Sequence, residues 1–80
     1  MNAGIRQWPD ESLERKAYNA AATIPAAEQN DTNRLGYHVY LFLKGEIRSL
    51  ADAVHVAQAN MLVDREEVVR RLAAELESNP

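Results

Sequence analysis

The chain has 80 residues, of which 46% are hydrophobic and none is cysteine, and its formal net charge is −3. This length allows one small domain, and the absence of cysteine excludes disulfides and thiolate metal sites. The acidic balance disfavours the broad basic surface of nucleic-acid-binding proteins. We expect a flexible N-terminal arm over residues 1–8 and one helical domain over residues 9–80.

The same features suggest a cellular setting. No stretch is long and apolar enough to span a bilayer, so we expect no membrane partner. The polar N-terminus lacks the apolar region of a signal peptide, which favours a cytoplasmic protein. The abundance of Ala, Arg and Glu suggests a bacterial or phage gene.

The first helix is predicted over about residues 10–24. Pro9 and Asp10 are typical of a helix start, because proline suits the first turn and a carboxylate can cap it. Pro25 ends the helix. Its apolar face is narrow and rich in alanine, and consists of Leu13, Ala17, Ala20, Ala21 and Ile24.

The densest apolar run is Leu35–Leu43, which holds the only Phe and two of the three Tyr. Its aromatic and β-branched residues favour a strand. No other segment resembles a partner strand, however, and an isolated hairpin is only marginally stable. We therefore predict a helix over about 32–44, capped by Asp31 or Thr32 and ended by a left-handed Gly45.

This second helix is predicted to be central because it is apolar nearly all round. At about 100° per residue, Leu35, Val39 and Tyr40 share one broad face with Phe42 and Leu43. Tyr37 and Leu41 fall on the opposite side. The helix is therefore either wrapped by the other three or carries a second apolar patch.

Two further helices are predicted over about 48–62 and 65–78. Ser49 and Asp64 each precede an acidic residue at capping-box spacing. Short connections make neighbouring helices antiparallel, so the sequence predicts an all-α domain of four helices. The expected inward residues are Ile47, Leu50, Ala51, Val54, Ala57, Met61 and Leu62 in the third helix, and Val68, Val69, Leu72, Ala73 and Leu76 in the fourth.

An alternative interpretation of Leu50–Leu62, LADAVHVAQANML, is that it resembles the first helix and turn of a helix-turn-helix. His55 stands where that motif has a left-handed Gly. The following segment, Ala57–Asp64, lacks the Lys or Arg that phosphate contacts require. The resemblance implies a DNA-binding transcriptional regulator that uses residues 50–71. Its candidate contacts are Gln58, Asn60, Arg65, Arg70 and Arg71. The competing interpretation is one uninterrupted amphipathic helix.

Catalytic signals are weak in this sequence. There is no Cys and no Gly-rich phosphate loop, and the serines lie at predicted helix ends, where capping explains them. We expect no enzyme activity and no cofactor. His38 and His55 are the only histidines, and two ligands do not complete a zinc site, so no metal is expected.

Apolar residues on otherwise polar faces are the main functional signal. Exposed apolar patches mark interaction sites, and Trp and Tyr are common anchors. The alternative is that the arm folds back and covers Tyr37 and Leu41. We predict a small non-catalytic regulatory or inhibitory protein that binds another protein, plausibly as a homodimer. The candidate contact residues are Trp8, Tyr37, Leu41, Val56 and Val63.

Overall fold

The computed structural model describes residues 11–78, which fold into four helices and confirm the predicted all-α class. The helices are α1 (Glu11–Ala22), α2 (Gln29–Leu43), α3 (Leu50–Ala57) and α4 (Arg65–Ser78). The predicted arm over residues 1–8 and the predicted start of the first helix lie outside the described residues.

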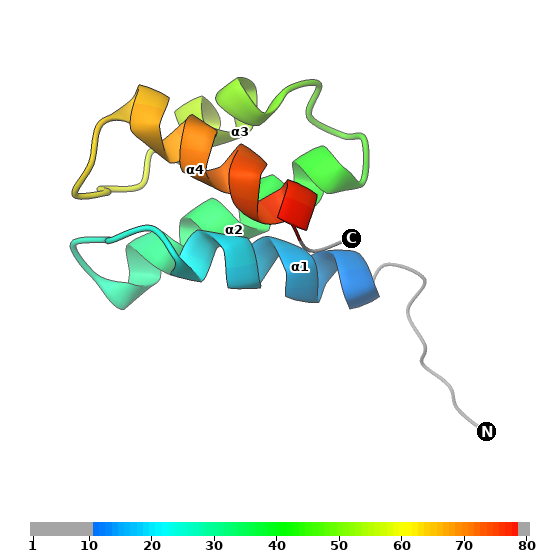
Figure 1. The fold of residues 1–80 in the computed structure, drawn as a ribbon, viewed down its shortest axis with the longest axis horizontal. Coiled ribbons are helices and arrows are strands. Elements are labelled where there is room, and N and C mark those ends of the chain that lie inside the picture. Colours follow the sequence, from blue (N-terminus) through cyan, green and yellow to red (C-terminus); the bar gives the residue numbers. More distant parts are fainter. Residues whose placement is uncertain (1–10, 79–80) are drawn as a thin grey trace.

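The helices form two antiparallel hairpins that stack as layers, α1 with α2 and α3 with α4 (Figure 1). Each helix packs against two others, in the closed order α1, α2, α3, α4 and back to α1. The backbones of α2 and α4 do not come within 8 Å of each other between Cα atoms. Helix α2 is therefore not wrapped by all three companions, and one of its faces points outward.

The two hairpin loops lie side by side at one end of the molecule (Figure 1). Ala26 and Met61 form an antiparallel bridge. On either side of it, the Ala27 N–H donates to the Asn60 carbonyl at 2.9 Å and the Leu62 N–H donates to the Pro25 carbonyl at 2.8 Å. These bonds satisfy backbone groups that two isolated loops would leave to water.

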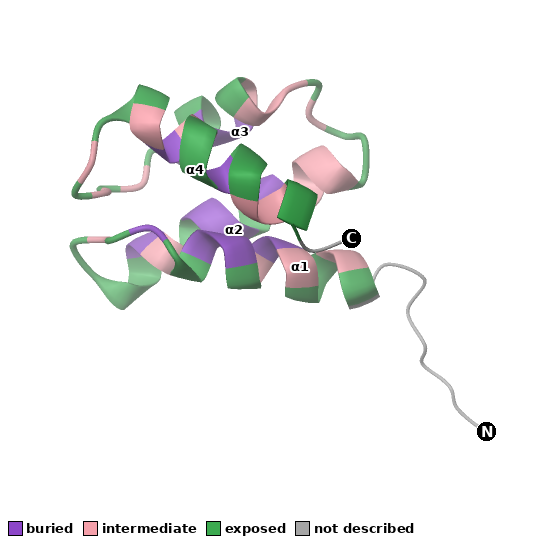
Figure 2. Cartoon of the chain, in the orientation of Figure 1, coloured by how far each residue is buried: buried purple, intermediate pink, exposed green. Residues whose placement is uncertain are grey.

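The core lies between the two layers, where the buried residues of all four helices face one another (Figure 2). The alanine-rich face predicted for the first helix is confirmed except for Leu13, which is half-buried. Ala53 is fully buried although the sequence pattern did not place it inward. The main buried cluster is Ala17, Ala20, Ala21, Ile24, Leu35, Val39, Val54, Ala57, Val68 and Leu72.

Helices α1 and α2 approach closely because Gly36 has no side chain. A Cβ at that position would lie 2.4 Å from Cδ1 of Tyr18, far inside van der Waals contact. The Tyr18 ring therefore packs directly on the α2 backbone. Gly45 has φ +88°, so the left-handed glycine predicted after α2 is confirmed.

Helix α2 begins at Gln29 rather than at residue 32. Glu28 has the extended backbone of an N-cap, and Asp31 lies in the first turn instead of capping the helix. The Asp31 carboxylate accepts the Glu28 N–H at 3.2 Å. An acidic side chain in the first turn therefore provides the hydrogen-bond acceptor for the backbone N–H of the N-cap residue.

Helix α3 is shorter than the predicted 48–62, because it ends at Ala57. Gln58 terminates it with left-handed backbone angles, φ 50° and ψ 40°. Both earlier interpretations need correction: the helix is not uninterrupted, and the left-handed residue is Gln58 rather than His55. The physical reason is the loop pairing, since a helix continued through Asn60 and Leu62 would lose their backbone bonds to the first loop.

Candidate partner-binding surfaces

The outward side of α2 carries an apolar patch, which we call the α2 outer face and define by Tyr37 and Leu41. Tyr37 is 48% exposed, and its ring meets the His38 ring edge-on at a centroid distance of 5.2 Å. Leu41 is half-exposed and does not belong to the core cluster. Tyr37 therefore lies outside the main face, as the sequence predicts, but Leu41 does not differ from Phe42, which the sequence places on the main face and which is also half-buried outside the core cluster.

Tyr18 extends this patch onto α1. The pKa of its phenol is raised above the usual 10.0, chiefly by burial and then by electrostatic interaction with the Glu14 carboxylate and with Tyr37. The Tyr18 ring packs against Gly36, the residue before Tyr37, at the junction of α1 and α2. The patch therefore crosses two helices.

Cations flank the α2 outer face along its own helix. Arg34 and Lys44 lie three residues before Tyr37 and three residues after Leu41, spacings that keep them on the same side of a helix. Lys44 Nζ lies 3.5 Å from a Glu46 carboxylate oxygen and 5.2 Å from the centre of the Tyr40 ring.

A second feature is a groove between α3, the following loop and the start of α4, which we call the loop groove. Its volume is about 430 Å³, within the range of small binding sites. Its apolar part contains the buried Val54 and Val68, and its rim contains exposed polar side chains. The residues that line it are Val54, His55, Gln58, Ala59, Asn60, Met61, Val63, Arg65 and Val68.

The polar side chains of the loop groove can all donate hydrogen bonds, and only Arg65 has no acceptor atom. Arg65 Nη1 lies 3.1 Å from Nδ1 of His55, so the arginine donates and the neutral imidazole accepts. Arg34 Nη1 donates to the Gln58 carbonyl at 3.5 Å, which brings a second guanidinium beside the groove. No carboxylate lines the groove among the residues the structure describes.

A buried carboxylate fixes the shape of this groove. Asp31 is 7% exposed, and its Oδ1 accepts the Asn60 N–H at 3.1 Å while Oδ2 accepts the Glu28 N–H. One side chain of α2 thus holds both hairpin loops. Residues 58–60 are positioned by the other hairpin, not by α3 alone.

The structure brings together three of the five residues assigned to DNA binding. Gln58, Asn60 and Arg65 line the loop groove, whereas Arg70 and Arg71 both pair with Glu67 outside it. The segment between α3 and α4 is a loop and not the recognition helix that the motif requires.

The other predicted contact residues lie apart. Val56 is 48% exposed on α3, while Val63 packs against the core and lines the loop groove. Trp8 lies outside the described residues. The five predicted contacts therefore do not form one surface.

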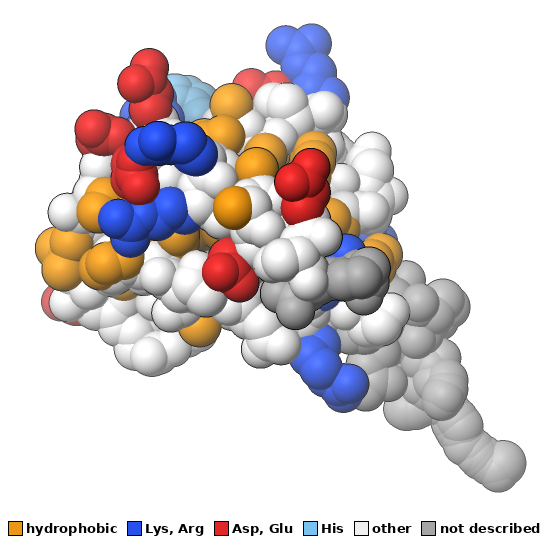
Figure 3. All heavy atoms as spheres, viewed as in Figure 1, with side chains coloured by type: hydrophobic (Ala, Val, Ile, Leu, Met, Phe, Trp, Pro, Cys, Tyr) orange, Lys and Arg blue, Asp and Glu red, His pale blue; other side chains and the backbone are white. Residues whose placement is uncertain are grey.

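The apolar tip of the paired loops is not predicted by the sequence pattern. Leu62, expected to face inward, is 67% exposed, and its backbone is bonded to that of the exposed Pro25. Figure 3 shows hydrophobic side chains grouped at the end of the molecule where these loops lie. A signal was present in the Gln58–Asn60 triplet, whose polar residues interrupt the helical pattern before Leu62.

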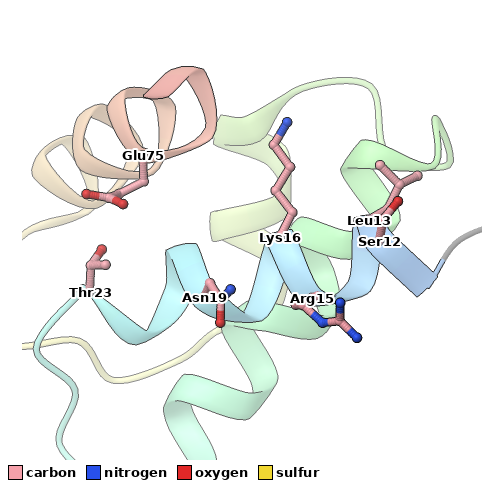
Figure 4. Close-up of a pocket in the computed structure, with 7 residues that line it drawn as sticks. All are labelled: Ser12, Leu13, Arg15, Lys16, Asn19, Thr23 and Glu75. Carbon is pink, nitrogen blue, oxygen red and sulfur yellow. The ribbon is translucent and has the colours of Figure 1, made fainter. Parts of the chain in front are cut away.

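The sequence pattern also does not predict an open groove of about 630 Å³ between α1 and α4. Figure 4 shows its α1 side chains arranged along the helix and Glu75 facing them from α4. Thr23 Oγ1 donates to the Ala20 carbonyl at 2.7 Å, and no histidine lines the groove among the described residues. The lining residues are Ser12, Leu13, Arg15, Lys16, Asn19, Thr23 and Glu75.

Two classes of feature are absent from the part of the chain that the structure describes. Residues 11–78 contain no group of three His, Cys, Asp or Glu side chains arranged to hold a metal ion. No helix within the same residues has the length and hydropathy needed to cross a membrane.

Comparisons with protein-family models, with curated proteins and with solved structures found no match for this chain.

Proposed function

We propose that this chain is a small non-catalytic regulatory or inhibitory protein that acts by binding another protein through the α2 outer face. The observation that carries the proposal is the position of Tyr37 and Leu41, one helical turn apart on the side of α2 that no other described helix covers. Tyrosine beside an aliphatic residue is a common composition for the centre of an interface.

The hydroxyl side chains support the non-catalytic part of the proposal, because the bonds they form are local. Ser49 Oγ accepts the Asp52 N–H at 3.0 Å, as a helix cap does. Ser78 Oγ donates to the Glu75 carbonyl at 3.3 Å. Neither serine lies beside a histidine that would activate it as a nucleophile.

Charge favours a different protein over a second copy as the partner. In a dimer, a two-fold axis could cross α2 at right angles at the level of Val39. Tyr37 and Leu41 lie two residues before and two residues after that level, so Tyr37 of one copy would pack on Leu41 of the other. The same axis would place Arg34 near Lys44 of the second copy, whose carboxylate partner Glu46 is already paired, so Arg34 would meet no free negative charge there. The fitting partner is an amphipathic segment with an apolar stripe and an acidic residue at the end that meets Arg34.

The test is quantitative affinity capture from cell extract with three baits: the unchanged chain, Tyr37→Ala with Leu41→Ala, and Val56→Ala. Val56 is the matched control because it is as exposed as Tyr37 but lies on α3. A partner that binds the unchanged chain and the control about 30-fold more tightly than the double variant supports the proposal.

Two results would overturn it. The first is equal capture by the double variant, whose fold is checked by circular dichroism. The second is a dimer in sedimentation measurements that the double variant dissociates, because a second copy would then occupy the α2 outer face.

A further inference from the structure

The loop groove brings together two arginines that form no ion pair within the described residues, whereas Lys16, which also forms none, lies apart from them in the groove between α1 and α4. Within residues 11–78, Lys44, Arg48, Arg70 and Arg71 each form an ion pair with a carboxylate, as Figure 3 illustrates by the mixed charges around α4. Arg34 and Arg65 pair with none. Both of these arginines lie at the loop groove: Arg65 lines it, and Arg34 is bonded to the carbonyl of Gln58, which also lines it.

The other polar groups of the loop groove can also donate, although the amides of Gln58 and Asn60 each have an oxygen that accepts. Within the described residues, the side-chain amides of Gln58 and Asn60 make no hydrogen bond, since the bonds of these residues come from their backbones. Because Nδ1 of His55 accepts from Arg65, the ring proton is on Nε2, which is a donor. This set of donors matches an anion, and two guanidinium groups match a carboxylate in particular.

The apolar part of the loop groove selects among anions. Met61 and Val63 are half-buried at the groove and pack against the core. A group that fills this space gains from burying an aliphatic side chain as well as from pairing with the cations. A bare inorganic anion would leave the apolar part empty.

We propose that the loop groove binds an acidic peptide segment, with a carboxylate on Arg65 and Arg34 and a neighbouring aliphatic side chain against Met61 and Val63. The amides of Gln58 and Asn60 then bond to the peptide backbone. This site shares Arg34 with the flank of the α2 outer face but involves neither Tyr37 nor Leu41, and it does not depend on the function proposed for that face.

Nucleic acid fits the loop groove less well than a peptide does. Binding to a phosphate backbone uses a row of cations, but the cations that follow Arg65 along α4 are neutralised by Glu67. Asp64 and Glu66 flank Arg65 directly and are exposed. A long polyanion laid across the groove would meet these carboxylates, whereas a short peptide need not.

The experiment is a nuclear magnetic resonance titration of the uniformly ¹⁵N-labelled full chain. The probe is a blocked hexapeptide of alternating leucine and glutamate, and the matched ligand has glutamine in place of glutamate. The expected result is movement of the amide signals of residues 58–65 with the glutamate peptide and little movement with the glutamine peptide. Raising the salt concentration should weaken binding, because the cations are exposed.

Variants connect the effect to the groove. Arg65→Gln should weaken glutamate-peptide binding about tenfold, the effect of one charge-assisted hydrogen bond, and Arg34→Gln should act in the same direction. Arg48→Gln is the matched control, since Arg48 is paired with Asp52 and does not line the groove. Tyr37→Ala with Leu41→Ala should leave peptide binding unchanged, which separates this site from the α2 outer face.

Four outcomes would overturn the proposal: no signal movement at millimolar peptide, equal binding of the glutamine peptide, signals that move only outside residues 58–65, or unchanged affinity in Arg65→Gln. A short DNA duplex that moves the same signals at lower concentration than the peptide would assign the groove to nucleic acid instead. Movement of those signals on simple dilution of the chain would assign it to a second copy.

Discussion

The hairpin of α1 and α2 is closely packed, whereas the hairpin of α3 and α4 leaves a groove beside its loop. In the first hairpin, Ala17, Ala21 and Gly36 are buried, and Tyr18 rests directly on the α2 backbone. In the second, α3 has only 8 residues and ends at Gln58, whose left-handed backbone begins the loop. Small side chains between α1 and α2 thus allow close packing of the first hairpin. The short α3 leaves the space beside the second loop unfilled, and this space is the loop groove.

The two hairpins also differ in how their loops are held. The first loop is capped at its end by Asp31 of its own hairpin, which accepts the Glu28 N–H, and has one backbone N–H, that of Ala27, bonded to the second loop. The second is held from outside, because Asn60 and Leu62 depend on Asp31 and Pro25 of the first hairpin. The binding surface proposed for the second hairpin is therefore only as rigid as its junction with the first.

The strongest way to break this junction is Asp31→Ala. The substitution removes the acceptor for two backbone N–H groups and leaves that of Asn60 without its bond, so we expect a loss of about 2–3 kcal/mol in the free energy of unfolding. Urea denaturation followed by circular dichroism measures it. Asp64→Ala is the matched control: Asp64 accepts only the Glu67 N–H, 2.9 Å away, and its loss should cost about 1 kcal/mol. Equal effects of the two variants would contradict a role for Asp31 in joining the hairpins.

A smaller effect is expected from Gly36→Ala, which tests the close packing of the first hairpin. Alanine gains about 1 kcal/mol over glycine inside a helix, but overpacking against the Tyr18 ring costs about 1–3 kcal/mol. The net expectation is a loss of about 1 kcal/mol in thermal or urea denaturation. In a Tyr18→Ala background the same change should become stabilising, because the clash is gone. Stabilisation by Gly36→Ala alone would show that the ring moves aside and imposes no constraint.

The smallest effect, and one of opposite sign, is expected from Gln58→Gly. Glycine adopts left-handed angles without the steric penalty of a side chain, so the free energy of unfolding should rise by about 1 kcal/mol or less. Gln58→Ala is the control, because alanine keeps the penalty and should give no gain.

The glycine variant should also bind the glutamate peptide more weakly, since it lacks the side-chain amide. Tighter peptide binding by that variant would count against a role for Gln58 in the groove.

Much of the fold could be predicted from the local sequence. Helix α4 has the predicted bounds because an acidic cap precedes Arg65 and the apolar spacing runs without interruption from Val68. The buried face of α1 followed from the spacing of its alanines, and the outward position of Tyr37 followed from helical geometry. Each of these features depends on residues within a few turns of one another.

The features that could not be predicted all depend on contacts distant in sequence. Helix α3 stops at Ala57 because the backbones of Asn60 and Leu62 bond to those of Ala27 and Pro25 in the first loop. In each pair the partners are more than thirty positions apart in the chain. Leu62 is exposed for the same reason. The loop groove was missed because its two cations come from different hairpins, and only the folded chain shows that neither has a carboxylate partner.

The pairing of the loops also bears on how the molecule opens. The amide protons of Ala27 and Leu62 each belong to one hairpin loop and bond to the other, so neither exchanges until the pairing of the two loops opens. Their rates of hydrogen exchange with water should therefore rise and fall together. A ligand that clamps either hairpin would slow exchange in both, which makes these two protons reporters for any partner wherever it docks.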